Sequence, residues 1–277
     1  MIPGLKAPSN LKIDFAPSPR QYEVWKNLQP ECPLCGGNVT QVQNGVDRNG
    51  NPTYTSVCEK CGNDNIPQII LGGGAAGGGK SYLGSCWLIS SCLRWPDMRM
   101  VVARKTLKSL RESTWNTIQS VAKSWGLEEQ VHFKINNLSG EMIFWNGSKI
   151  IMKEMAYSPS DPDYLRFGSS EFSGGFIDEV GEVDQRGVDV LFSRLRWKVA
   201  ETTKVPKLFM STNPCMGWVR DRFVLDENAE PVVCRPNEMY IPFSVYDNPD
   251  KNFVNAYVSS LYLSLIHISE PTRPRLI

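Results

Sequence analysis

The chain has 277 residues, enough for one large domain or for one domain with a small module. Its hydrophobic fraction of 41% is ordinary for a globular protein, and its net charge of +1 excludes a strongly basic chain without excluding a local basic patch. No apolar run is long enough to span a membrane and residues 1–6 lack the apolar core of a signal peptide, so we expect a cytosolic protein.

The first 28 residues are expected to form an irregular arm and a short helix. Residues 1–20 are rich in Pro and Ser, which favour turns and irregular structure. The segment Pro19-Arg20-Gln21-Tyr22 then begins a helix whose apolar anchors include Val24 and Trp25. Taken alone, this segment predicts only a surface helix.

The cysteines fall into two groups. Two C-x₂-C pairs flank the loop 36–57, a spacing that fits a tetrahedral zinc site with a small hairpin between the pairs. A redox dithiol fits less well, because two matched pairs are present and so small a module lacks a core of its own. We therefore expect a structural zinc ribbon whose ligands are Cys32, Cys35, Cys58 and Cys61. The remaining cysteines, which are Cys86, Cys92, Cys215 and Cys234, are expected to be buried thiols.

A phosphate-binding loop is predicted after the apolar run at residues 69–71. Residues 74–81 fit the pattern G-x-x-x-x-G-K-[ST], in which glycines let backbone N–H groups turn inward around a phosphate. Lys80 would reach the β- and γ-phosphates of a nucleotide, and the Ser81 hydroxyl would hold Mg²⁺. A flexible linker is the alternative, but a linker needs neither a buried strand before it nor Gly-Lys-Ser after it. The residues expected to bind the phosphates are Gly74, Gly77, Gly78, Gly79, Lys80 and Ser81.

Alternating helices and strands are expected after this loop. The expected elements are a helix at 82–95 and strands at 98–103, 131–135, 141–145 and 148–153. Apolar residues at helical spacing predict one further helix over 107–125. Asn146-Gly147 is a strong signal for a hairpin between the last two strands.

A second motif lies where an apolar strand ends in two acids, at residues 172–180. This Walker B pattern predicts that Asp178 joins the Mg²⁺ shell and that Glu179 orients the attacking water. Alone the pattern is weak, but its position well after a P-loop, with several strands between, strengthens it. Two adjacent acids favour hydrolysis over kinase chemistry.

A strand at 207–211 is expected to end in the polar segment Ser211-Thr212-Asn213-Pro214. Polar groups at a strand's carboxyl end lie where such sheets bind ligands, so Asn213 could sense the γ-phosphate. A simple Asn-Pro turn is the alternative. The other expected elements are helices at 188–197 and 217–224 and a strand at 239–245.

The order of these motifs resembles the large terminase subunit of tailed bacteriophages, a motor that packages viral DNA. Four pieces carry the resemblance in order, and with the segment 104–113 they cover residues from about 12 to 250. They are an adenine-recognition segment with Gln21, Walker A at 73–81, Walker B at 175–179, and a coupling motif at 211–214 with Gly217-Trp218-Val219.

The resemblance implies an α/β fold, a P-loop NTPase three-layer sandwich with a mostly parallel sheet and an inserted zinc ribbon. It implies ATP bound with Mg²⁺ on Ser81 and Asp178, and Glu179 as the catalytic glutamate. The implied partners are double-stranded DNA, the portal of the procapsid, the small terminase subunit and further copies in a ring. The implied location is the host cytoplasm.

The chain departs from the family in three ways. Where many members carry a P-loop arginine it has Ala75 and Ala76, so the transition-state arginine must come from elsewhere. The candidates are Arg104, Arg166, Arg194, Arg196 and an arginine of a neighbouring subunit. The cysteine module is an insertion, and the chain stops before an RNase H-like nuclease could fit, so no nuclease activity is expected.

The last residues resemble a translated adapter used in library preparation. We therefore expect 263–277 to be non-native and His267 to have no function, with a real strand or helix start as the alternative. His132 is expected to be structural. The resulting division is an arm with the adenine segment (1–28), a zinc ribbon (29–65), a P-loop ATPase domain (66–262) and the tail (263–277).

Two other functions fit the same residues. A helicase-like DNA-dependent ATPase would need further motifs and usually a second motor domain. A zinc-based DNA- or protein-binding module on an inactive nucleotide-binding domain would tolerate replacement of Glu179.

Overall fold

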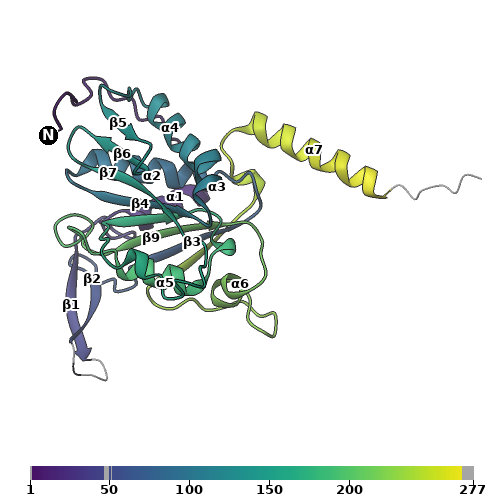
Figure 1. The fold of residues 1–277 in the computed structure, drawn as a ribbon. Helices are drawn as coiled ribbons and strands as arrows, with labels where there is room; N and C mark the ends of the chain where they lie inside the picture. The colour runs from purple at the N-terminus through teal and green to yellow at the C-terminus, as the bar shows by residue number, and fades with distance from the viewer. Residues whose placement is uncertain (1, 47–49, 51, 270–277) are drawn as a thin grey trace, which may run out of the picture.

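An eight-stranded sheet covered by helices on both faces forms the body of the protein (Figure 1). The computed structural model describes residues 2–46, 50 and 52–269, without the side chains of 52 and 262–269. The strands are β3 (Ile69–Gly74), β4 (Arg99–Arg104), β5 (Phe133–Asn136), β6 (Glu141–Phe144), β7 (Lys149–Glu154), β8 (Gly174–Ile177), β9 (Lys207–Thr212) and β10 (Glu238–Phe243).

The strand order is β10-β3-β9-β8-β4-β7-β6-β5. From β10 to β7 every neighbour is parallel, whereas β7, β6 and β5 pair antiparallel. The predicted hairpin at Asn146-Gly147 is confirmed, because it joins β6 to β7. The mostly parallel sheet is confirmed as well, and it places the carboxyl ends of β3, β4, β8 and β9 along one edge.

Two apolar layers hold the helices to the sheet. On one face Ile70 packs with α1 (Pro19–Leu28), α2 (Lys80–Arg94) and α4 (Thr114–Ser124). On the other face Ile69 and Leu71 pack with α5 (Gln185–Ser193) and α6 (Trp218–Phe223). Alternate residues of one strand thus enter opposite cores, as a strand buried on both sides requires. The result is the expected three-layer sandwich.

The expected helix over 107–125 is wrong in one respect, because two helices meet there. The first, α3 (Leu107–Glu112), ends before α4 begins at Thr114, and Ser113 between them has the non-helical angles φ −124° and ψ −83°. The hydroxyl of Ser113 donates to Ser109 O at 2.8 Å. Serine and threonine hydroxyls compete for backbone groups in this way, which favours helix ends.

The expected helix over 188–197 is also shifted, because α5 ends at Ser193. Its last turn is closed by Arg194 N, which donates to Leu191 O at 3.0 Å. The chain then turns back towards the sheet, where Trp197 N donates to Phe172 O at 2.9 Å.

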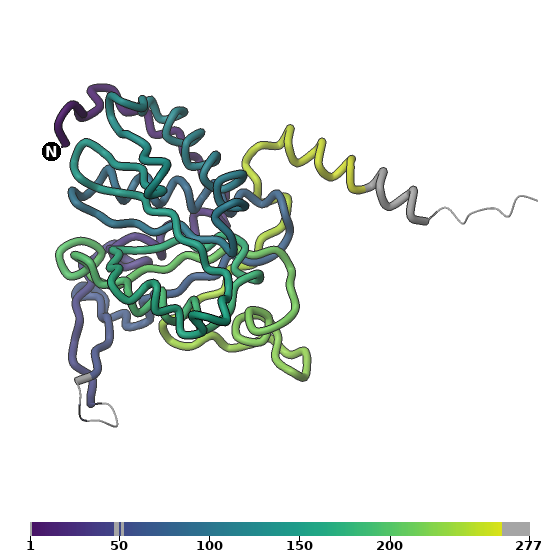
Figure 2. Tube along the Cα trace, viewed as in Figure 1, coloured from purple at the N-terminus to yellow at the C-terminus, as the bar shows by residue number. Residues whose placement is uncertain are grey.

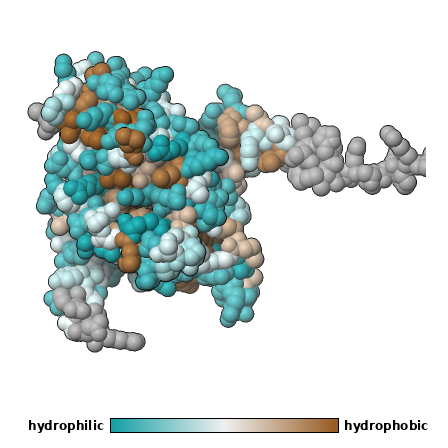
Figure 3. Space-filling model, in the orientation of Figure 1, coloured by the Kyte–Doolittle hydropathy of each residue, from teal (hydrophilic) through white to brown (hydrophobic). Residues whose placement is uncertain are grey.

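The N-terminal arm is irregular, as expected, but it is fixed along one end of the sheet (Figure 2). Its backbone donates from Ile2 to Trp145 O, from Lys6 to Val131 O and from Lys12 to Trp125 O. In the view of Figure 3 apolar side chains gather over this end of the molecule, and most of the remaining surface is hydrophilic.

Two elements project from the body. The antiparallel hairpin of β1 (Val39–Val46) and β2 (Pro52–Cys58) stands at one corner, and α7 (Lys251–Ser269) points away on the other side (Figure 1). Of the expected non-native tail, residues 270–277 and the side chains of 263–269, including that of His267, lie outside the described residues. No described helix combines the length and apolar character needed to cross a bilayer.

Candidate functional site

The loop between β3 and α2 has the conformation that its glycines were expected to allow. Gly74, Gly77 and Gly79 have φ values of +123°, +81° and +77°. A Cβ at Gly74 would lie 2.1 Å from Phe243 O, so the close approach of β10 also requires glycine there. The loop curls around the Lys80 ammonium, which donates to Gly74 O at 3.1 Å and to Ala75 O at 2.6 Å.

Asp178 lies at the carboxyl end of β8, directly beside Ser81. The Ser81 hydroxyl donates to Asp178 Oδ1 at 2.9 Å, although the two residues are far apart in sequence. A hydroxyl and a carboxylate are oxygen ligands of the kind that Mg²⁺ prefers, so these two residues fit the expected metal. Asp178 is buried, and its oxygens also accept from Thr114 and Ser211.

Glu179 is the first residue beyond Asp178 and has the left-handed angles φ +53° and ψ +52°. Its carboxylate accepts from Asn213 Nδ2 at 2.9 Å and from Asn213 N at 3.3 Å. Burial raises the pKa of Glu179, and the charge of Asp178 raises it further, while Asn213, Arg104 and Lys80 oppose the shift.

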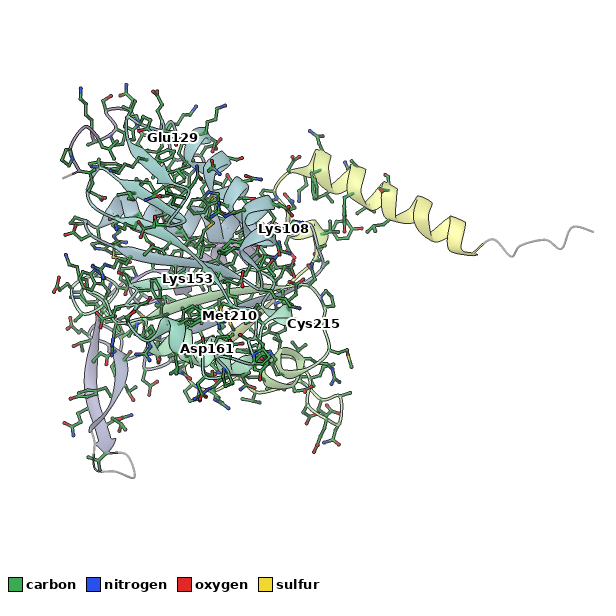
Figure 4. All side chains as sticks on the ribbon, viewed as in Figure 1. Lys108, Glu129, Lys153, Asp161, Met210 and Cys215 are labelled. Carbon is green, nitrogen blue, oxygen red and sulfur yellow. The ribbon has the colours of Figure 1, made fainter. Side chains whose placement is uncertain are left out.

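Asn213 connects the two ends of the site. Its Oδ1 accepts from Lys80 Nζ at 3.4 Å while its Nδ2 donates to Glu179. Burial lowers the pKa of Lys80, and the charges of Glu179 and Asp178 oppose this shift. In Figure 4, Met210 within β9 and Cys215 beyond its end show the direction in which this strand approaches the site.

Gln21 reaches the P-loop, but its side chain is fully buried. Its Oε1 accepts from Ser18 N at 3.0 Å, and its Nε2 donates to Gly79 O at 3.4 Å. A Cβ at Gly79 would lie 2.4 Å from Gln21 Nε2. In this structure Gln21 therefore braces the P-loop from the start of α1.

Among the four candidate arginines, Arg104 lies beside the acidic pair. It ends β4, and its charge is close enough to lower the pKa of Glu179. Arg166 pairs with Asp161 at 3.0 Å, and Arg196 pairs with Glu171 at 2.9 Å.

The expected role of Arg194 at the P-loop of its own chain needs correction. Its carbonyl accepts from Phe172 N at 2.9 Å, which places the residue near the amino end of β8, away from Asp178 and Glu179 at the carboxyl end. Because a parallel sheet separates the two ends of its strands, this arginine and the P-loop lie at opposite edges.

Sequence reasoning missed two residues that touch the motifs. Thr114 Oγ1 donates to Asp178 Oδ2 at 2.5 Å, and Asn248 Nδ2 donates to Gly77 O at 2.7 Å. Neither contact has a local signal, because each joins segments far apart in sequence. His132, by contrast, accepts from Glu128 N at 2.9 Å in the turn before β5, which is a structural contact.

The four cysteines of the two C-x₂-C pairs come together as predicted. Their sulfur atoms all lie within 4.8 Å of one another, with Cys35 and Cys58 at 3.5 Å and Cys32 and Cys61 at 3.7 Å. A tetrahedron of Zn–S bonds of about 2.3 Å has sulfur atoms about 3.8 Å apart, so the cluster has the right size for zinc.

The backbone around the cluster has the shape of two matching knuckles. Gly36 N donates to Cys32 O at 2.9 Å and Gly62 N donates to Cys58 O at 3.0 Å. Although burial opposes it, the backbone N–H groups of Leu34 and Cys35 lower the pKa of Cys32 to about 6. A stabilised thiolate in a group of four sulfur atoms is the donor chemistry that a structural zinc ion needs.

The ribbon lies at the edge of the sheet away from the P-loop. Cys32, Val39 and Cys58 share a small core with Ile66, before β3, and Val205, before β9. Both contacts are at amino ends of strands, whereas the P-loop follows a carboxyl end. The cluster therefore cannot act on a group bound at the P-loop.

Comparison with known proteins gives one family. A family model described as phage terminase large subunit matches residues 66–260. No curated protein matches the sequence.

The fold is similar to that of one solved structure. The large terminase of a thermophilic bacteriophage has 16% identity and a TM-score of 0.55, over 88% of this chain and 50% of that one. The same protein in complex with ADP has 17% identity and a TM-score of 0.49, over 69% of this chain and 44% of that one. The large terminase ATPase domain of a Thermus phage has 13% identity and a TM-score of 0.47, over 74% of this chain and 84% of that one. The chain thus spans about half the length of the first structure.

Proposed function

Because the chain belongs to the phage terminase large subunit family, we propose that residues 66–262 form the ATP-hydrolysing part of a DNA-packaging motor. The observation that carries this proposal is the convergence of three distant segments at one sheet edge. Ser81 contacts Asp178, and Asn213 contacts both Lys80 and Glu179. Such a set binds a nucleotide and activates water, and it is more than a phosphate-binding loop alone requires.

ATP binding begins with the phosphates over the P-loop. The backbone N–H groups of Gly74, Gly77, Gly78 and Gly79, which lead from the end of β3 into α2, would donate hydrogen bonds to the phosphate oxygens. Lys80 would exchange its hydrogen bonds to the loop carbonyls for bonds to phosphate oxygens. The partly buried ammonium would then have an anionic partner. Gln21 would support the adenine side through its contact with Gly79.

The residues fit a magnesium ion between Ser81 and Asp178. Bound there, Mg²⁺ would offset the negative charge of the β- and γ-phosphates. Glu179 would then orient the attacking water and hold its proton, and Asn213 would report the state of the γ-phosphate to β9 and α6. Of the four candidate arginines, Arg104 is placed to meet the charge that develops on that phosphate, because its charge already acts on Glu179.

The partners follow from family membership. We infer double-stranded DNA, the portal of a procapsid, the small terminase subunit and further copies of this chain as partners. Contacts to DNA phosphates would make binding fall with rising salt concentration. We also infer that Cys32, Cys35, Cys58 and Cys61 hold a structural zinc ion.

The first test is ATP hydrolysis by the full chain with and without double-stranded DNA. We expect Glu179→Gln to lower the rate by about 10²- to 10⁴-fold while nucleotide affinity is retained. Glu182→Gln is the matched control, because Glu182 is an exposed carboxylate three residues on. Stimulation of the wild type by DNA would support the motor.

Two results would contradict the proposal. A wild-type chain that binds no ATP would show that the P-loop has lost its function. A wild type that binds ATP but hydrolyses it no faster than Glu179→Gln would show that this chain alone is an inactive nucleotide-binding domain.

A further inference from the structure

The break between α3 and α4 lies next to Asp178, the first of the two adjacent acids. Ser113 is its single non-helical residue, and Thr114 is the first residue of α4. The hydroxyls of these two neighbours point to different members of the candidate site.

Thr114 holds one oxygen of the Walker B aspartate. Its hydroxyl donates to Asp178 Oδ2 at 2.5 Å, and both residues are buried. The other oxygen, Oδ1, accepts from Ser81 at 2.9 Å and from Ser211. Ser81 and Ser211 belong to the motifs already assigned, whereas Thr114 belongs to none. Without Thr114, the buried Oδ2 loses this donor, and the orientation of the carboxylate depends on the two hydrogen bonds to Oδ1 alone.

Ser113 contacts Arg104, next to the residue that contacts Asp178. Arg104 Nη1 donates to Ser113 Oγ at 2.5 Å and more weakly to Ser109 O at 3.4 Å. Arg104 Nε is buried without a hydrogen-bond partner, and no ion pair with Arg104 occurs among the described residues. A guanidinium held by neutral oxygens can exchange them for a phosphate at lower cost than one held by a carboxylate.

We propose that Ser113 and Thr114 form a positioning pair for ATP hydrolysis. Thr114 fixes the orientation of Asp178 for Mg²⁺, and Ser113 keeps Arg104 beside the γ-phosphate position. The inference rests on the proposed ATPase function. It adds two residues outside the Walker and coupling motifs, and it gives the break between α3 and α4 a purpose.

The Thr114 half is tested by binding rather than turnover. A fluorescent ATP analogue is titrated with and without Mg²⁺, and the gain in affinity from Mg²⁺ is the readout. We expect Thr114→Val to reduce that gain by about tenfold or more, as loss of a hydrogen bond to a charged group predicts, and Thr114→Ser to preserve it. Thr117→Val is the matched control, because the Thr117 hydroxyl donates to a backbone oxygen, Ser113 O, at 3.3 Å and not to Asp178.

The Ser113 half is tested by a double-mutant cycle with Arg104. The readout is the gain in affinity when aluminium fluoride joins ADP to mimic the transferring phosphate. We expect Ser113→Ala to reduce this gain about tenfold in the wild-type background and to have no further effect beside Arg104→Ala. Ser113 is only partly buried, so this variant keeps the test open should Thr114→Val fail to fold.

The outcomes separate this inference from the proposed function. If the wild type binds nucleotide and Thr114→Val keeps the full Mg²⁺ gain, or if Ser113→Ala and Arg104→Ala act additively, the positioning pair is overturned and the ATPase proposal stands. If the wild type binds no nucleotide, both are overturned.

Discussion

At the scale of single residues, Glu179 shows how the site prepares one carboxylate. Its left-handed backbone turns the side chain towards Asn213, and its neighbour in sequence, Asp178, is a buried acid. A non-glycine residue in this conformation costs about 1–3 kcal/mol, which the surrounding contacts must offset. Burial and the charge of Asp178 then raise the pKa of Glu179.

This pKa shift predicts how stability changes with pH. Because the native pKa of Glu179 is raised, the unfolded state loses this proton first, so stability falls as the pH rises from the unfolded pKa, about 4.3, through the higher native pKa. Glu179→Gln should therefore melt at a higher temperature than the wild type at pH 7. The difference should shrink as the pH falls towards the unfolded pKa of about 4.3, because below it the carboxyl becomes protonated in both states. Thermal melting across pH 4 to 7 measures it, and a constant difference would contradict the prediction.

At the scale of elements, the P-loop is tied to its neighbours at several points. Ala75 N donates to Phe243 O at 2.9 Å, which joins the loop to the end of β10. Gly79 is held by Gln21 from α1, and Gly77 by Asn248 from the segment before α7. The loop is thus built into the fold, which explains why so many of its positions require glycine.

Gly74→Ala tests this packing. A Cβ there would lie 2.1 Å from Phe243 O at a φ of +123°, so both overlap and backbone strain oppose it. We expect a loss of unfolding free energy above the strain cost of about 1–3 kcal/mol. Gly126→Ala is the control, because its φ is +82° but the nearest atom, Asn10 O, is 3.5 Å away. Denaturant unfolding compares the two, and equal losses would show that the contact with β10 is unimportant.

Local patterns could predict much of this fold, since they arise from neighbouring residues. The Asn146-Gly147 turn, the helix after Lys80 and the paired cysteines depend on local chemistry, and the structure has them where expected. The break at Ser113 was missed because the apolar spacing continues across it. The position of Arg194 and the contact of Thr114 with Asp178 depend on how distant strands are ordered, which no single segment encodes.

At the scale of the whole molecule, the four-cysteine module of β1 and β2 shares a small core with the eight-stranded sheet. Cys32 and Cys58 are buried together with Ile66 and Val205, so the module is packed onto the amino-end edge of the sheet rather than attached by a free linker. The cysteine cluster and the P-loop lie at opposite ends of the strands of the sheet.

Removing the metal should therefore lower stability without removing the nucleotide site. We expect one zinc ion per chain, lost in Cys58→Ser, with a lower melting temperature but retained ATP-analogue binding. Cys234→Ser should keep its zinc, because Cys234 is a half-buried thiol outside the cluster. Metal analysis and thermal melting check this. Full zinc content in Cys58→Ser would exclude the four-cysteine site.

The separation of the hairpin from the site also makes the hairpin useful as a handle. The six residues of β9 span about 20 Å, and they lie between the core at Val205 and the polar groups at Asn213. A dye or surface tether placed on β2 would sit beyond that distance from any bound nucleotide. The motions of a working chain could then be followed optically from a point that takes no part in its chemistry.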